Sequence, residues 1–198
     1  MYLNNNAEKI EAIKHLNLGS INKPTEIPKS LLIGCEKNLS IYYAPFDHVN
    51  NKAKVVIVGI TPGFTQLKNA YASLQNNLRS GKTIDESLAK VKSDASFSGS
   101  MRSNLIEMLN YVGIHEWLGI PSTAQLFSTR SDLLHSTSCL KNPVFVGGAN
   151  YNGTPNMLKS NFLRDHIYEN FAQEAKNVND AIFIPLGPKP SEALEHLA

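Results

Sequence analysis

One stretch decides the fold that we expect: Val55-Val56-Ile57-Val58-Gly59-Ile60-Thr61-Pro62-Gly63. Its four consecutive β-branched residues are typical of a strand that is buried on both faces in a parallel sheet. The glycine and proline that follow end the strand. Because ligands of open α/β sheets bind beyond the carboxyl ends of the strands, we expect a functional site at this turn.

The composition is that of an ordinary globular protein. The chain has 198 residues, 42% of them hydrophobic and 18% charged, which predicts one domain spanning residues 1–198. The net charge of +2 permits a basic patch but does not by itself indicate nucleic-acid binding. The two cysteines, Cys35 and Cys139, form no CxxC pair, which argues against a disulfide framework, a structural zinc site and an iron–sulfur cluster. No apolar run reaches membrane-span length and no signal-peptide pattern is present, so we expect a cytoplasmic protein with no membrane partner.

Helical and strand patterns alternate along the chain. Strands are predicted at 39–43, 55–60, 124–127 and 181–187, with a strand or loop at 133–139. Helices are predicted at 7–16, 65–79, 83–92 after a capping box at Thr83, 101–112, 158–175 and 191–197 with Ser191 as N-cap, and a helical turn from Pro28 to Gly34. Residues 142–156 are expected to form a long loop. The pattern favours an α/β fold, a three-layer α/β/α sandwich with a central, mainly parallel sheet, preceded by a helical extension at 1–50.

Four segments, taken in order, resemble the uracil-DNA glycosylase superfamily. Residues 59–63 (GITPG) resemble its first motif, which in other branches reads GQDPYH, GEAPG or GINPG. Residues 96–105 resemble the segment that places an aromatic ring over the flipped base, and 137–143 the strand end that carries the pyrimidine-reading Asn. Residues 183–187, followed by a helix, resemble the third core strand. The similarity runs from about Ala53 to the C-terminus, while segments 42–48 and 150–155 suggest a distinct branch.

The resemblance implies a glycosylase-like fold and a monofunctional DNA glycosylase that acts as a monomer, with DNA as its partner and without metal or cofactor. Such an enzyme flips the base out of the duplex and stacks it on an aromatic ring. Backbone N–H groups at the turn would stabilise the negative charge that develops on the leaving base. The implied base-binding residues are Gly59, Ile60, Pro62, Gly63, Phe64, Gln66, Phe97, which would stack, and Ser138. The implied catalytic residues are Thr61, Asp132 and His135, and the implied DNA-binding residues are Ser98, Arg102 and Asn150.

Three positions depart from the family pattern. Thr61 stands where the water-orienting Asp or Asn is found, and a hydroxyl is no base at neutral pH, so Asp94, Asp132 or His135 would have to activate water. Ser138 replaces the pyrimidine-reading Asn. Gly63 stands where the strictest uracil enzymes carry a Tyr that blocks substituents, so we expect room there. Together these changes predict a larger or modified pyrimidine rather than strict uracil recognition.

The superfamily's second motif, a His-Pro-Ser loop, is expected after Leu197 and is not found. Segment 189–191 (Lys-Pro-Ser) is either an altered version of it or, as we prefer, the start of a helix. On that interpretation the last strand and the loop are missing or lie beyond Ala198.

Two other functions stay open. The first is a catalytically inactive DNA- or partner-binding module on the same fold, which the loss of both polar pocket residues and of the loop favours. The second, an unrelated nucleotide- or phosphate-binding enzyme, ranks lower because neither GxGxxG nor GxxxxGKS is present. Individual residues also have structural interpretations: Phe97 as core, Arg102 as a solvated helix residue, His135 as structural and Asn150 as a left-handed turn residue.

Overall fold

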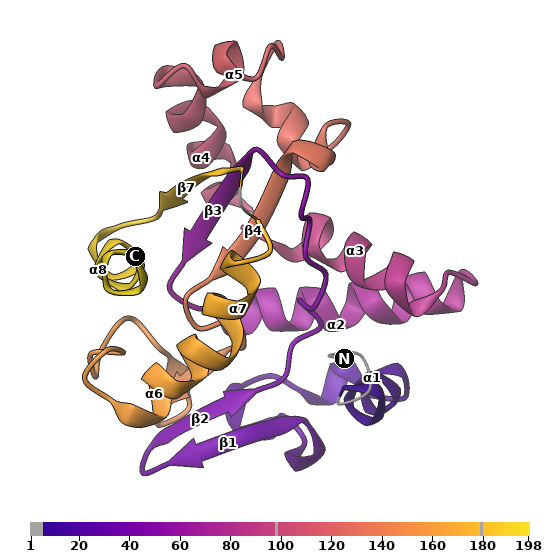
Figure 1. Cartoon of the computed structure of the whole chain (residues 1–198). Coiled ribbons are helices and arrows are strands. Elements are labelled where there is room, and N and C mark those ends of the chain that lie inside the picture. Colours follow the sequence, from indigo (N-terminus) through magenta and orange to yellow (C-terminus); the bar gives the residue numbers. More distant parts are fainter. Residues whose placement is uncertain (1–5, 98, 179) are drawn as a thin grey trace.

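The protein is of the α/β class, with two separate sheets (Figure 1). A computed structural model describes residues 6–97, 99–178 and 180–198. The parallel sheet has the order β4-β3-β7, with β3 at Val55–Gly59, β4 at Leu134–Ser138 and β7 at Ile182–Pro185. All residues of the central strand β3 are buried, as its run of β-branched side chains predicts.

The strands of the parallel sheet end together. Gly59 lies opposite Ser138 and Val58 opposite Pro185. The pairing of β3 with β4 continues past the strands, because the Leu140 N–H donates to the Ile60 carbonyl at 2.9 Å. The turn that follows β3 is therefore fixed against the residues that follow β4.

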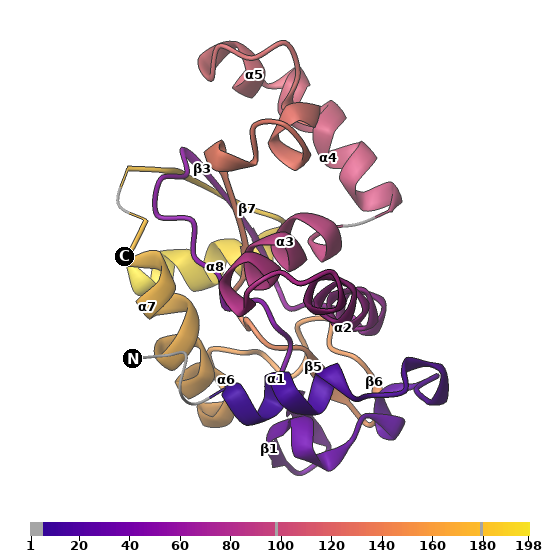
Figure 2. The same cartoon turned by 90° about the vertical axis from the view of Figure 1, so that its right-hand side faces the viewer.

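Helices cover both faces of the parallel sheet. Val55 and Ile57 pack with Leu105 and Leu109 of α4 (Ser100–Tyr111). The alternate residues of β3, Val56 and Val58, pack against helices on the other side. One of these is a continuous helical segment made of α6 (Asn161–His166), the π-helical η7 (Ile167–Phe171) and α7 (Ala172–Ala175). The other is α8 (Pro188–Leu197). A short helix, α5 (Ile114–Trp117), follows α4, and the two project from one end of the molecule (Figure 2).

A second, antiparallel sheet was not expected from the sequence. Its order is β1-β2-β5-β6, with β1 at Leu32–Glu36, β2 at Leu39–Tyr42, β5 at Val144–Val146 and β6 at Ala149–Asn150. The strand predicted at 39–43 is present as β2. The sequence did not predict its partners: β1 lies in the region expected to be a helical extension, and β5 and β6 lie in the region expected to be a loop, so the sheet predicted as single is one of two. The physical reason is a pairing between segments distant in sequence: Val144 is buried beside Leu39 and Ile41.

The N-terminal part contributes a further core. Helices α1 (Ala7–Lys14), α2 (Phe64–Arg79) and α3 (Ile84–Ala95) enclose buried side chains that include Tyr43 and Phe145. The predicted capping box at Thr83 is confirmed. The Thr83 side chain accepts from the Glu86 N–H, and the Glu86 carboxylate accepts from the Thr83 N–H. Short 3-10 turns connect the elements: η2 (Leu18–Ser20), η3 (Pro24–Glu26), η4 (Lys29–Leu31), η5 (Thr123–Phe127) and η6 (Ser131–Leu133).

Local capping decides three differences from the predicted elements. Residues 124–127 form η5 instead of a strand, because the Ser122 hydroxyl accepts from the Ala124 N–H at 3.2 Å and closes a helical turn. The predicted helix at 158–175 begins at Asn161 after its N-cap, Ser160. Helix α8 begins at Pro188 and not at Ser191, whose hydroxyl instead donates to the Gly187 carbonyl at 3.0 Å. In the described part of the chain, no helix combines the length and apolar character needed to cross a bilayer.

Candidate functional site

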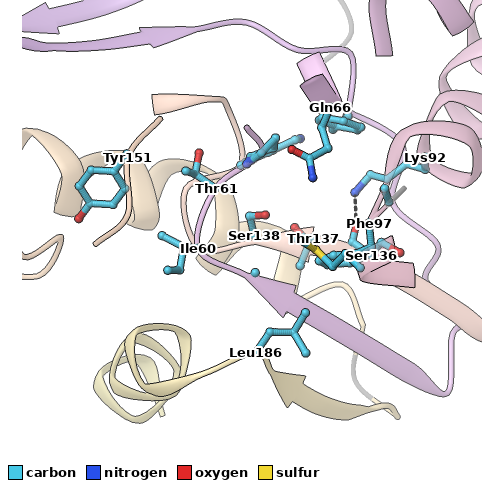
Figure 3. A pocket seen from close by; sticks show the side chains of 16 residues that line it. Ile60, Thr61, Gln66, Lys92, Phe97, Ser136, Thr137, Ser138, Tyr151 and Leu186 are labelled. Atoms are coloured by element: carbon cyan, nitrogen blue, oxygen red, sulfur yellow. Dashed lines mark hydrogen bonds between the residues drawn. The ribbon is translucent and has the colours of Figure 1, made fainter. Parts of the chain in front are cut away.

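The turn after β3 opens onto a cavity of about 260 Å³ (Figure 3). Its walls come from turn residues 59–62, from 136–138 at the carboxyl end of β4, and from side chains that include Gln66 of α2, Lys92 of α3 and Phe97. This volume is near the lower end of the range for small-molecule sites, which suits a single aromatic ring system. Of the residues expected at the site, the structure brings Gly59 to Pro62, Gln66, Phe97 and Ser138 together around this one cavity.

Gly59 allows two of these groups to approach the strand end closely. A Cβ on Gly59 would lie 3.2 Å from the Ser138 Oγ and 3.5 Å from the Phe97 ring. Phe97 itself has a φ of +49°, a left-handed conformation that bulky residues rarely adopt. Such conformations occur preferentially at functional sites, where the surrounding packing holds them. The ring is therefore held beside the strand end in an uncommon backbone conformation.

Two backbone amides of the turn are occupied by side chains. The Gly63 N–H donates to the Gln66 Oε1 at 2.7 Å, and the Phe64 N–H donates to the Asn150 Oδ1 at 2.9 Å. This corrects one expectation, because these two amides are not free to stabilise an anion. Asn150 is exposed and uses its Oδ1 to cap α2, and its predicted contact with DNA stays a prediction. Gly63 itself is not among the residues that line the cavity, so the room expected there does not belong to this site.

The Thr61 side chain connects the turn to the start of β5 through two hydrogen bonds. Its hydroxyl donates to the Asn142 carbonyl at 3.0 Å and accepts from the Val144 N–H at 3.2 Å. A hydroxyl has one donor and two acceptor lone pairs, so a single lone pair is left for a water molecule. The side chain can position the turn, but it has little capacity to activate water.

The expected water-activating residues lie elsewhere. His135 pairs with Val56 at the amino-terminal half of β4, and a strand rise of about 3.3 Å per residue puts it roughly 10 Å from Ser138. Asp132 precedes β4, is exposed, and is held by two hydrogen bonds of 3.1 Å from the Arg130 guanidinium. Asp94 accepts from the Ser73 hydroxyl at 2.8 Å. The parallel direction of β3 and β4 thus separates Asp132 and His135 from the turn, which corrects their assignment as catalytic residues there.

Arg102 is used within the protein. Its guanidinium donates to the carbonyls of Ser93 at 2.9 Å and Ser96 at 2.6 Å, where α3 ends. It also lies 5.0 Å from the centre of the Phe127 ring. These contacts give Arg102 a structural role at the end of α3, while its predicted contact with phosphate stays a prediction. Ser98, also expected to contact DNA, lies outside the described residues.

A buried charge cluster, which the sequence did not reveal, lies beneath the cavity. It consists of Asp47, Lys92, His135, Lys141 and Glu174. Glu174 Oε1 lies 2.5 Å from His135 Nε2 and 3.3 Å from Lys92 Nζ, and its Oε2 lies 3.6 Å from Lys141 Nζ. Lys141 Nζ is also 3.6 Å from Asp47 Oδ1. The side chains of Lys92 and Glu174 are only 8% and 3% exposed, so each depends on the other for charge compensation.

Burial and charge shift the protonation of this cluster. Burial, with the nearby charge of Lys92, lowers the pKa of His135 to about 4, so the imidazole is neutral. Burial alone would raise the pKa of Glu174, but the charges of Lys92 and Lys141 and the His135 hydrogen bond hold it below its ordinary value. Burial lowers the pKa of Lys92, and the charge of Glu174 opposes that shift.

One sequence signal could have found Lys92. It stands four residues after Leu88 and therefore on the apolar face of α3. Lys141 follows the end of β4 and Glu174 lies in α7, and no local sequence pattern distinguishes either residue.

The chemistry that lines the cavity is aromatic, hydroxyl and cationic. Lys92 and Lys141 both line it, and no Asp or Glu does so among the described residues. No group of three or more His, Cys, Asp and Glu side chains that could hold a metal ion occurs in the described ranges. The arrangement can bind a flat ring against Phe97 and offer hydrogen-bond donors to an electron-rich edge.

Comparison with known proteins gives one informative relative. The chain is 38% identical over 194 residues to the uncharacterized protein YoxB of Bacillus subtilis (strain 168), a similarity that covers 96% of this chain and 74% of the relative. No protein-family model and no solved structure matches the chain.

Proposed function

The chain belongs to the same family as YoxB, and we propose that it is a DNA glycosylase with a uracil-DNA glycosylase-like fold. It flips out a uracil-like base, preferentially a larger modified pyrimidine, and hydrolyses the N-glycosidic bond to leave an abasic site. One observation carries the proposal: the Phe97 ring, the Ser138 hydroxyl and the strand-end turn surround one cavity of about 260 Å³. In this proposal the protein acts in the cytoplasm as a monomer, without metal or cofactor.

In this proposal each group around the cavity has a task. The flipped base stacks on Phe97, as extruded bases stack on aromatic side chains. Ser138 Oγ contacts the edge of the base from the neighbouring strand. Gln66 lines the cavity from α2, and while its Oε1 accepts from the Gly63 N–H, its Nε2 donates to a substituent on the ring. The proposed preference for modified bases thus rests on Gln66 and not on open space at Gly63.

The experiment is a base-release assay. Oligonucleotides, single- and double-stranded, carry one uracil, 5-hydroxymethyluracil or 5-hydroxymethylcytosine, and released base is identified by mass spectrometry alongside alkali-induced strand breakage. We expect release from at least one 5-substituted pyrimidine. Release should be slowed at least about 10-fold in Phe97→Ala and kept in Tyr111→Ala, which replaces an aromatic residue that is 92% exposed on α4. Efficient release of uracil alone would overturn the preference, and no release from any substrate would overturn the activity.

A second candidate is a catalytically inactive DNA- or partner-binding module on the same fold. It is favoured by the engagement of the Thr61 hydroxyl with residues 142–144 and by the lack of a carboxylate among the described lining residues. Fluorescence anisotropy with the same oligonucleotides separates the two: this candidate binds DNA and releases no base.

A further inference from the structure

We infer that the Lys92 ammonium group stabilises the negative charge on the departing base, which makes it a catalytic residue of the reaction proposed above. The inference rests on the proposed function and deepens it. It starts from the position of Lys92, which extends from α3 to the wall of the cavity beside Phe97 and Ser136 (Figure 3).

The hydrogen bonds of Lys92 leave a donor for a ligand. Its Nζ donates to the Ser136 carbonyl at 2.8 Å and to the Glu174 Oε1 at 3.3 Å. An ammonium group has three N–H donors, so one remains beyond these two protein acceptors. Because both acceptors hold the group in place, the remaining N–H needs little reorganisation to reach an anion in the cavity.

The charges around the cavity favour an anionic ligand. Lys92 and Lys141 line it, whereas their partners Glu174 and Asp47 are not among its lining residues. Two lysines therefore line the cavity, and no carboxylate of the described lining residues opposes their charge. In a site with little water, the attraction between a cation and a developing negative charge is much stronger than in bulk solvent.

The reaction step balances without a further reagent. The bond between the sugar C1′ and the base N1 breaks, and its electron pair leaves with the base. The sugar becomes an oxocarbenium-like cation, takes up a water molecule and releases a proton to solvent. The base anion accepts a hydrogen bond from Lys92 and is then protonated by water, while Lys92 keeps its own proton.

The variant that tests this must not leave a buried charge without a partner. Lys92→Met alone would remove one of the two ammonium groups that compensate the buried Glu174, and this imbalance would destabilise the chain. The test variant is therefore the double substitution Lys92→Met with Glu174→Gln, and Lys92→Arg keeps the charge. The matched control is Lys90→Met, which removes an exposed lysine two residues earlier on the same helix.

The first readout is the dependence of single-turnover release on the acidity of the leaving base, using the 5-hydroxymethyl derivative of the substrate pyrimidine as parent base and its 5-formyl derivative as the more acidic base. We expect about a 100-fold loss for the parent base in the double variant, as for removal of one oxyanion donor. The loss should be several-fold smaller for the more acidic base, and Lys92→Arg should recover part of the rate. An equal loss for both bases, or trapping of a protein–DNA adduct by borohydride, which indicates attack by the amine, would overturn the inference.

The second readout does not need catalysis. Isothermal titration compares 5-nitrouracil, a ring anion in mildly alkaline buffer, with neutral thymine. We expect the anion to bind at least 10-fold more tightly to the unmodified protein and to Lys90→Met, with that preference lost in the double variant. A preference that survives in the double variant, or no preference in any protein, would overturn the inference. Lys92-dependent anion binding without base release would refute the proposed function alone.

Discussion

Lowering the pH should destabilise this protein through two buried histidines. His135 and His166 are 1% and 6% exposed. Burial, with the charge of Lys92, lowers the pKa of His135 to about 4, and burial, with the charge of Lys141, lowers the pKa of His166 to about 4. An unfolded histidine has a pKa near 6.5. Between these values the unfolded chain binds more protons than the folded one, so acidification favours unfolding.

The magnitude follows from the linkage between protonation and folding. At pH 5 an unfolded histidine is almost fully protonated, while one with a folded-state pKa of about 4 is mostly neutral. The difference amounts to roughly 2 kcal/mol for each histidine, or about 4 kcal/mol for both, between pH 7 and pH 5. Since domains are stable by about 5–15 kcal/mol in total, this is a large fraction of the stability.

The assay is urea unfolding followed by circular dichroism at pH 7 and pH 5, with NMR titration of both imidazoles. The variant His135→Gln should be less stable at pH 7, because Glu174 loses one of its two hydrogen-bond partners, but its stability should fall by about 2 kcal/mol less on acidification. The matched control His15→Gln removes an exposed histidine of the N-terminal region and should leave the pH dependence unchanged. Equal stability at the two pH values, or an imidazole of His135 or His166 that titrates near pH 6.5, would refute the reasoning.

Three further predictions concern the turn. Asn150→Ala removes the acceptor of the Phe64 N–H and should lower the free energy of unfolding by about 1 kcal/mol in urea titrations, as loss of an N-cap does; an unchanged midpoint would contradict the capping role. Thr61→Val leaves the Asn142 carbonyl and the Val144 N–H without their hydrogen-bond partner. It should lower the free energy of unfolding in urea titrations by about 1–3 kcal/mol, and Thr61→Ser should restore most of that stability. Phe97→Ala should slow base release by about 10- to 100-fold at saturating protein, the value of one stacking contact, and a variant that retains full rate would show that the ring does not stack.

Local sequence predicted the parts of the fold whose determinants are close together in the chain. The β-branched run at 55–58 predicts a strand buried on both faces, and β3 is buried throughout. The capping box at Thr83 predicts the start of α3, because its two reciprocal bonds involve residues only three positions apart. The turn at 59–63, with its glycine and proline, likewise predicts where the strand ends and where a cavity lies.

The remaining features depend on contacts between distant segments, and only the tertiary structure decided them. The antiparallel sheet forms because residues 39–41 pair with 144–146, which no local pattern predicts. The direction of β4 places His135 and Asp132 away from the turn, although their order along the chain suggested otherwise.

The amino-acid sequence by itself determined the central strand, its turn and the glycine that lets Phe97 and Ser138 approach, because these depend on backbone conformation and side-chain volume at single positions. Tertiary structure decided which groups around that turn remain free. In the folded chain the Gly63 and Phe64 N–H groups donate to Gln66 and Asn150. The Lys92–Glu174 ion pair is buried next to the cavity. The physical reason is that hydrogen bonds and ion pairs join whichever groups the fold brings within about 3–4 Å, and that proximity is set by packing across the whole chain.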